Sequence, residues 1–346
     1  MISLSNKIGV VVIGRNEGSR LVRSLNSVVG ESRPVVYVDS GSTDSSCAFA
    51  RSIGVEVVEL DMSIPFTAAR ARNAGFERLR QLHPTVEYVQ FIDGDCEVIE
   101  GWLIAGAETL EAKPDVVAVC GWTCERHPER NIYTRICNIE WHMGPVGEIS
   151  NFGGNVMIRA DALAAVGGFN PSVIAAEDDE LGVRLRQAGG KLLRLDRDSV
   201  LHEVDMDRLW QWWQRAKRCG YAFAQVSQLH GAPPERKFVK DIRQTWLWGF
   251  IMPLVALILM LPTGGLSLII FARYPLTALK VAYKTKKRGF SWADGFAWGV
   301  SCAMSAFPQV LGVVQYLRVS LITKQHQIIE YKAPQAPATK PTASVS

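Results

Sequence analysis

Short apolar segments alternate with amphipathic ones over the first 120 residues. Five segments rich in β-branched residues are predicted to be strands, at 8–13, 35–38, 55–60, 88–92 and 116–119. Between the first two strands, residues 19–29 carry apolar side chains at helical spacing on one face. Alternating strands and helices predict a parallel α/β sheet covered on both faces, which binds ligands beyond the carboxyl ends of its strands.

Two long stretches near the C-terminus, 244–272 and 295–317, lack charged residues. The first exceeds the roughly 17 to 25 residues that a membrane-spanning helix needs, but Pro-Thr-Gly-Gly interrupts it at 262–265. A single crossing would put the basic groups before and after it on opposite sides, which the positive-inside rule disfavours. A hairpin, re-entrant or crossing, keeps both groups cytoplasmic. The alternative is a buried helical pair in a soluble domain, but the composition favours membrane association.

Composition narrows the class of protein. With 38 basic and 34 acidic residues the net charge is +4, so nucleic acid is not expected as a partner. The seven cysteines show no repeated spacing and no signal-peptide pattern opens the chain, which favours a reducing cytoplasm. Cys120, Cys124 and His127 lie close enough to suggest zinc, but no second ligand pair follows, and ordinary thiols are the favoured interpretation.

A pair of carboxylates follows the predicted strand at 88–92. In Asp93-Gly94-Asp95, glycine allows a tight bend, and two carboxylates two residues apart can bind one Mg²⁺ or Mn²⁺ ion. The sequence therefore predicts a divalent cation at this strand end.

Polar residues also follow the first two strands. Asp-Ser-Gly-Ser-Thr-Asp at 39–44 is either a capping turn before a helix or a site for a base or ribose. Arg-Asn-Glu at 15–17 follows the first strand, so its side chains are expected to line the same polar crevice at the strand ends.

Together these motifs resemble the family 2 glycosyltransferases of the GT-A fold. The motifs at 15–17, 39–44 and 93–95, with Ala-Arg-Asn-Ala-Gly at 71–75, match the family in order and spacing, and the resemblance covers roughly residues 7–220. It implies an α/β domain with a Rossmann-like, mostly parallel sheet and helices on both faces.

The resemblance also implies a donor site for a nucleotide-diphosphate sugar. Its expected residues are Arg15, Asn16, Glu17, Asp39, Ser40, Arg72, Asn73, Asp93 and Gly94. In this assignment Asp39 holds the base with Arg72 and Asn73 nearby, Asp93 faces the ribose, and Asp95 binds the metal. Without the family pattern, Arg72 is equally well explained as a solvated helix charge.

A glycine-rich step at Gly153, Gly154 and Asn155 precedes a short apolar strand at 156–158. The resemblance implies that it lines the acceptor side of the cleft. The alternative is a tight turn that needs glycine for its backbone angles.

The densest acidic cluster of the chain is Glu177-Asp178-Asp179-Glu180, followed by Leu181. Acidic residues at a helix start also complement the helix dipole. The cluster resembles the family's Glu-Asp-x-Asp-Leu element, whose second carboxylate is the catalytic base. This implies that Asp178 is the base, with Glu177 supporting it on the acceptor side. A base is needed because an alcohol is a poor nucleophile near neutral pH.

Basic residues further along complete the expected site. The resemblance implies that His202 lies near the metal or diphosphate, although a lone histidine is more often structural. Residues 210–220 resemble the Gln-x-x-Arg-Trp helix of polysaccharide synthases, but Gln211 and Arg215 are four apart and no tryptophan follows, which puts processive polymerisation in doubt. Arg215 and Arg218 are expected to neutralise the leaving diphosphate, or to lie on a membrane-facing helix.

The sequence thus predicts an inverting, metal-dependent glycosyltransferase at the cytoplasmic face of the inner (plasma) membrane. It would use Mg²⁺ or Mn²⁺ and a glycan or lipid-linked acceptor, in cell-surface polysaccharide, exopolysaccharide or glycolipid synthesis. The expected organisation is a catalytic domain at 1–230, membrane-associated helices at 231–325 and a disordered tail at 326–346. The alternatives are a nucleotidyltransferase, which would need a glycine-rich basic loop after the first strand, and a non-catalytic membrane-anchored nucleotide-sugar binder.

Overall fold

The computed structural model describes residues 4–30, 33–322 and 328–329, so the predicted tail lies outside the described residues except at 328–329. Within them, nine strands form one sheet in the order β3-β2-β1-β4-β8-β6-β9-β5, with β7 paired to β9. The strands are β1 (Ile8–Gly14), β2 (Val35–Asp39), β3 (Glu56–Glu59), β4 (Tyr88–Asp93), β5 (Cys96–Val98), β6 (Val116–Glu125), β7 (Gly147–Ile149), β8 (Val156–Arg159) and β9 (Lys191–His202).

The predicted mostly parallel sheet is confirmed, with antiparallel strands in its second half. The strands β3, β2, β1 and β4 are parallel neighbours, and β6 runs parallel to β9. The strand β8 lies antiparallel between β4 and β6, and β5 and β7 lie antiparallel to β9. The strand predicted at 116–119 continues to Glu125, because β6 stays paired with β9 through several register shifts.

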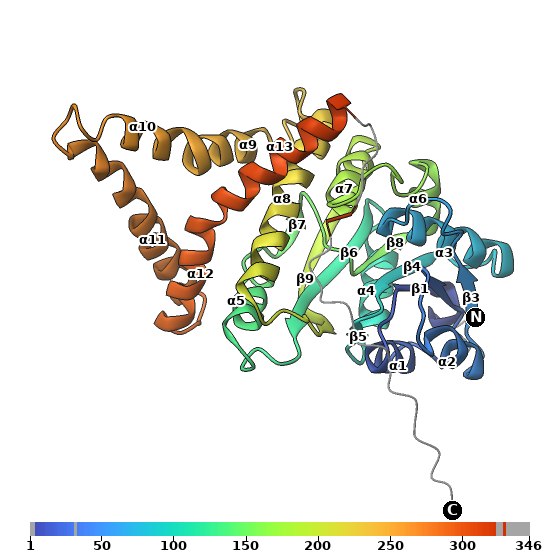
Figure 1. The fold of residues 1–346 in the computed structure, drawn as a ribbon. Coiled ribbons are helices and arrows are strands. Elements are labelled where there is room, and N and C mark those ends of the chain that lie inside the picture. The colour runs from blue at the N-terminus through green and yellow to red at the C-terminus, as the bar shows by residue number, and fades with distance from the viewer. Residues whose placement is uncertain (1–3, 31–32, 323–327, 330–346) are drawn as a thin grey trace, which may run out of the picture.

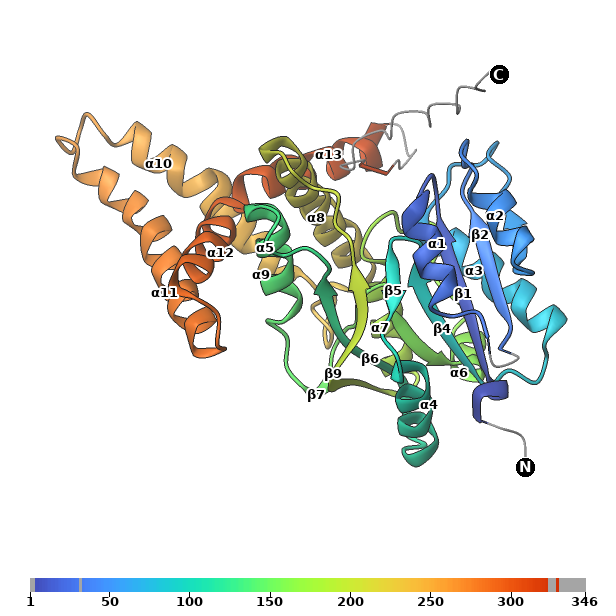
Figure 2. The same ribbon diagram turned by 90° about the horizontal axis from the view of Figure 1, so that it is seen from below.

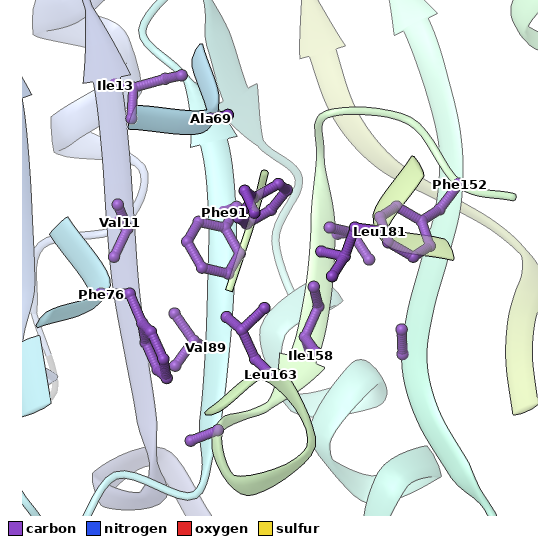
Figure 3. Packing of buried hydrophobic residues seen from close by; sticks show 14 of the residues in the cluster. Val11, Ile13, Ala69, Phe76, Val89, Phe91, Phe152, Ile158, Leu163 and Leu181 are labelled. Carbon is purple, nitrogen blue, oxygen red and sulfur yellow. The ribbon is translucent and has the colours of Figure 1, made fainter. Parts of the chain in front are cut away.

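Helices cover both faces of the sheet, as predicted. They are η1 (Leu4–Lys7), α1 (Ser19–Asn26), α2 (Ser46–Ser52), α3 (Ala68–Leu82), α4 (Trp102–Ala112), α5 (Ile132–Trp141), α6 (Ala160–Ala165) and α7 (Glu177–Gln187). Because successive strand residues point to opposite faces, Val11 and Ile13 of β1 belong to the core cluster on the side of α3, α6 and α7 (Figure 3), whereas Val10 and Val12 belong to the cluster on the side of α1, α2 and α4. The helix predicted at 19–29 ends at Asn26, and Val29 is exposed.

The C-terminal helices form an arm that projects away from the sheet (Figures 1 and 2). The helix α8 (Leu209–His230) precedes this arm. The arm consists of α9 (Val239–Trp246), the π-helix η2 (Leu247–Ile251), α10 (Met252–Ile258), the 3-10 helix η3 (Leu266–Ala272), α11 (Arg273–Lys287), α12 (Trp292–Met304) and α13 (Ala306–Ile322). The chain turns back between α10 and η3, where the sequence predicted a hairpin. Two helical stretches, Leu266–Lys287 and Trp292–Ile322, are long and apolar enough to cross a membrane.

The arm is joined to the rest of the chain by close packing of α13 on α8. A side chain at Gly220 would meet the Gln309 carbonyl oxygen at 2.0 Å, so the two helices touch through backbone. Next to this crossing, Tyr221 and Tyr316 pack with Ile329, a residue that the sequence assigned to the tail. The position of the arm relative to the sheet is therefore set by a packed interface.

Candidate active site

The carboxyl ends of β1, β2 and β4 meet at one edge of the sheet. The register pairs Gly14 with Asp39 and Ile13 with Asp93, so the polar turns that follow these strands start side by side. Gly94 packs against the end of β1, and its N–H donates to the Ile13 carbonyl at 2.7 Å. The convergence expected from parallel strands is thus observed.

The turns after β1 and β2 are tied to each other by hydrogen bonds. Asn16 donates its backbone N–H to Ser42 Oγ at 2.8 Å, and its Oδ1 accepts from the Thr43 N–H at 2.7 Å. The buried Asp39 carboxylate accepts from the Gly41 and Ser42 N–H groups at 2.9 and 2.7 Å, and from the hydroxyl of Tyr37 at 2.8 Å. The Asp39 carboxylate therefore shapes its own turn.

The other predicted donor residues of these turns are held in the same region. Arg15 lies over the Phe66 ring, with its Cζ 4.8 Å from the ring centroid, and Glu17 pairs with Arg20 at 3.0 Å. Ser40 is buried, and its N–H donates to the Gly14 carbonyl at 3.0 Å.

A cavity of about 580 Å³ opens beside this edge, between the sheet, α7 and α8. Ten of the residues predicted from the sequence line it: Arg72, Asp93, Gly153, Gly154, Asn155, Glu177, Asp178, His202, Arg215 and Arg218. They come from segments up to 146 positions apart, counting from position 72 to position 218. The fold therefore brings the expected base, the glycines expected on the acceptor side and the basic residues of α8 to one hollow.

Arg72 bridges two of these carboxylates at the cavity wall. It is only 2% exposed, which rejects the interpretation as a solvated helix charge. One guanidinium nitrogen donates to Asp93 at 2.8 Å, another donates to Glu177, and the group lies over the Phe169 ring. Burial alone would raise the pKa of Glu177, but the charges of Arg72 and Arg218, together with hydrogen bonds from Arg72 and the backbone, outweigh burial and hold this pKa below its ordinary value. Glu177 is therefore ionised.

Asn73, the neighbour of Arg72, has a different position. Its side-chain amide donates to the Phe169 carbonyl at 2.7 Å and accepts from the Phe169 N–H at 2.8 Å. It fixes the loop before α7 and is not among the described residues that line the cavity.

The four carboxylates at the start of α7 differ in their partners. Glu177 pairs with Arg72, Asp179 with Lys237 at 2.6 Å, and Glu180 with Arg184 at 2.6 Å. Among the described residues, Asp178 has no basic group within 4 Å. Burial, together with Glu177 and Asp179, raises the pKa of the Asp178 carboxyl well above its ordinary value. Asp178 thus combines a cavity position with the raised pKa that suits a general base.

The backbone before this helix is in an unusual conformation. Ala176, its N-cap, has φ 60° and ψ 36°, the left-handed region that residues other than glycine rarely adopt. Such conformations cost of order 1–3 kcal/mol and concentrate at functional sites.

The predicted metal residues also lie together. His202 Nε2 is 3.5 Å from Asp95 Oδ2, and the Cys96 thiol belongs to the same group of ligand atoms. Two ligands about 2.1–2.2 Å from one ion lie roughly 3 Å apart in octahedral geometry, so a small shift would let both bind one cation. The Trp141 and His202 rings pack in a T-shaped contact, with centroids 4.8 Å apart. This oxygen and nitrogen donor set fits Mn²⁺ or a similar divalent ion.

Arg215 and Arg218 of α8 form the basic wall of the cavity. Arg215 pairs with Glu140 at 2.7 Å, and this neighbour raises the pKa of Arg215 well above its ordinary value. Sequence reasoning missed Glu140, Trp141 and Lys237, which carry no local motif and take part only through contacts with distant residues.

Comparisons with known proteins agree with this geometry. The family model described as glycosyl transferase family 2 matches residues 9–167, and that of glycosyl transferase family group 2 matches residues 89–311. The chain belongs to the family 2 glycosyltransferases, enzymes that transfer a sugar from a nucleotide sugar and are typically inverting and metal-dependent.

Particular relatives include the succinoglycan biosynthesis protein ExoA of Rhizobium meliloti, 26% identical over 191 residues, or 52% of this chain and 57% of that protein. Glycosyltransferase AglE of Haloferax volcanii is 28% identical over 111 residues, or 30% of this chain and 35% of that protein. The matches thus span little more than half of the first relative and about a third of the second.

Two solved structures have a similar fold. The mannosyltransferase PcManGT from Pyrobaculum calidifontis, in complex with GDP-Man and Mn²⁺, is 19% identical, with a TM-score of 0.59 over 90% of this chain and 87% of that one. S. aureus TarS 1–349 in complex with UDP is 14% identical, with a TM-score of 0.51 over 88% and 91%. At these identities the likeness establishes the GT-A fold alone.

Proposed function

We propose that this glycosyltransferase moves a sugar from a nucleotide-diphosphate donor to a hydroxyl of a glycan or lipid-linked acceptor at the membrane. The transfer inverts the configuration at the sugar carbon. The observation that carries the proposal is the position of Asp178. It lines the cavity without a basic partner within 4 Å among the described residues, whereas the three carboxylates around it are each paired.

Asp178 is the base in this mechanism. Its carboxylate accepts the proton of the acceptor hydroxyl as the oxygen attacks the sugar carbon, and the bond from that carbon to the donor diphosphate breaks with its electrons on the diphosphate. A single displacement of this kind needs no enzyme nucleophile, and it inverts the configuration at the sugar carbon. Glu177 stays ionised because it is paired with Arg72. The negative charge of Glu177 raises the pKa of Asp178, which favours proton transfer to Asp178.

The leaving diphosphate needs positive charge. Arg218 lines the cavity on the same side as Arg215, and guanidinium groups bind phosphate oxygens through paired hydrogen bonds. Asp95 and His202 would hold the divalent cation, which when bound supplies Lewis-acid stabilisation of the diphosphate. The relative in complex with GDP-Man and Mn²⁺ supports this donor class.

Exposed apolar side chains support membrane association. Leu261 and Leu266, at the turn between α10 and η3, are 84% and 78% exposed, and only 11% of the apolar window in Leu266–Lys287 is buried. Soluble monomeric proteins rarely expose apolar surface of this extent, which marks a membrane or protein interaction site. Lys284, Lys286 and Lys287 cluster at the other end of α11, where they would meet lipid headgroups at the cytoplasmic face.

A smaller cavity of about 210 Å³ supports a membrane-bound acceptor. Arg273, Gln309 and Trp248 line it among the apolar helices of the arm, and polar groups in such surroundings mark substrate pathways. Phe223 lines both this cavity and the larger one, so the two cavities adjoin at this side chain. The likeness to a succinoglycan biosynthesis protein supports cell-surface polysaccharide as the product.

The test compares Asp178→Asn with Asp179→Asn in the purified full-length enzyme. Each is incubated with membrane lipid extract and a panel of labelled nucleotide sugars, with and without chelator. We expect Asp178→Asn to lose about 10²- to 10⁴-fold in transfer rate while keeping nucleotide affinity, because only proton removal is lost. Asp179→Asn should lose less than about ten-fold. Full activity of Asp178→Asn would exclude the proposed mechanism and favour a different base.

A further inference from the structure

A second group of metal-ligand residues lies between the sheet and α5. Cys124 on β6, Asp198 on β9 and His142, the residue that follows α5, offer ligand atoms within 4.8 Å of one another. Cys124 Sγ lies 3.8 Å from His142 Nε2. None of the three is among the described residues that line the large cavity, so this group is distinct from the site for the donor.

The His142 ring is already oriented for a ligand. Its Nδ1 lies 2.7 Å from the Asn138 carbonyl oxygen, which can only accept, so Nδ1 carries the proton. Nε2, which lies 3.8 Å from Cys124 Sγ, then carries the lone pair that can bind a metal. The Trp122 ring stacks on the imidazole with centroids 5.6 Å apart, and the edge of Phe290 packs at 6.3 Å. Metal-binding histidines in proteins are typically fixed by such a second hydrogen bond.

We propose that Cys124, His142 and Asp198 bind a zinc-class ion, with a water molecule as the fourth ligand. Bond lengths of about 2.3 Å to sulfur and 2.0–2.1 Å to nitrogen put two such ligands about 3.6 Å apart in a tetrahedral site. The sulfur and nitrogen are 3.8 Å apart, so little movement is needed. A thiolate and an imidazole select zinc over the oxygen-preferring Mg²⁺. The sequence favoured ordinary thiols, and the zinc alternative considered there grouped Cys124 with Cys120 and His127, which are outside this group.

The proposed site lies where the arm contacts the end of α5. The Arg288 side chain, just after α11, donates to the carbonyl oxygens of His142 and Gly144 at 2.8 and 2.9 Å, and Phe290 contacts the imidazole. Fixing His142 also fixes Trp141, whose ring packs on His202. The proposed ion is therefore structural: it fastens α5 to β6 and β9 beside the junction with the arm.

The test is a Co²⁺ titration of the full-length protein in detergent after removal of bound metal. Tetrahedral Co²⁺ with a thiolate ligand gives intense visible bands and a thiolate charge-transfer band. We expect both in the wild type, displaced by Zn²⁺. Cys124→Ser should abolish the charge-transfer band, and Asp198→Asn should weaken Co²⁺ affinity about ten-fold or more. Asp198 is exposed, so this variant tests the site even if Cys124→Ser fails to fold.

Matched variants separate this site from other thiols. Cys47 is half-buried like Cys124 but lies on α2, and Cys96 belongs to the Asp95 and His202 group. Cys47→Ser and Cys96→Ser should keep the charge-transfer band. The proposal is overturned if the wild type lacks the band, if Cys124→Ser keeps it, if Cys96→Ser abolishes it, or if Asp198→Asn binds Co²⁺ as tightly as the wild type.

Discussion

Gly154 offers a sharp test of the ion pairs around Arg72. A methyl group added at this position would lie 2.6 Å from an Arg72 guanidinium nitrogen and 3.1 Å from Asp93 Oδ2. Arg72 cannot swing aside easily, because Glu177 holds its other nitrogen and Phe169 packs on its face. Gly154→Ala should therefore break or stretch the 2.8 Å contact between Arg72 and Asp93.

The size of the effect follows from that contact. A hydrogen bond to a charged group contributes about 1.5–3 kcal/mol, and overpacking a filled site costs about 1–3 kcal/mol. We expect Gly154→Ala to lower the free energy of unfolding by about 2 kcal/mol, and the melting temperature by several degrees. Nucleotide affinity should fall with it, since Asp93 lies at the proposed donor site.

Gly153→Ala is the matched control. A methyl group there would meet nothing within 4 Å, and neither glycine has a positive φ. Thermal unfolding and nucleotide titration of the two variants would be measured side by side with the wild type. Equal melting temperatures and nucleotide affinities for Gly154→Ala and Gly153→Ala would refute the conclusion that the ion pairs of Arg72 are rigid and needed for stability and nucleotide binding.

Further predictions concern charge, pH and the membrane. Transfer should need ionised Asp178, whose pKa is raised, so kcat/KM should fall with decreasing pH well above the ordinary aspartate range near about 3.9, whereas a flat profile down to that range would contradict the assignment. Because the pKa of Asp178 is raised in the folded state, the folded protein loses stability as pH rises past the pKa that Asp178 has in the unfolded chain. The variant Asp178→Asn should therefore have a higher melting temperature than the wild type near neutral pH, and an unchanged or lower melting temperature would contradict this. Arg72→Met should cost about 3–5 kcal/mol of unfolding free energy by leaving Glu177 unpaired, and adding Glu177→Gln should recover much of it in chemical denaturation. Leu261→Lys with Leu266→Lys should weaken binding to anionic vesicles at least about ten-fold without changing the melting temperature in detergent, and unchanged vesicle binding would exclude insertion of this turn.

Much of the site was predictable from the sequence because strand ends are local features. Apolar runs mark the strands, and polar residues directly after them must lie at the edge where parallel strands end. Asp39, Asp93 and Gly94 were identified in this way, and the register of β1, β2 and β4 confirms that their turns adjoin. The acidic start of α7 was equally visible, as was the interruption between the two apolar segments of the arm.

The tertiary structure decided which of these side chains are paired. Within a helix, Arg72 looks like any exposed arginine until α7 brings Glu177 against it. Asp178 differs from its neighbours only because Arg72, Lys237 and Arg184 reach the other three carboxylates. Likewise Cys124, His142 and Asp198 belong to three separate elements that only the packing of α5 on the sheet brings together. Burial and charge pairing depend on contacts between residues that are far apart in the sequence. Hydrophobic periodicity reports only local secondary structure, so it cannot predict those contacts.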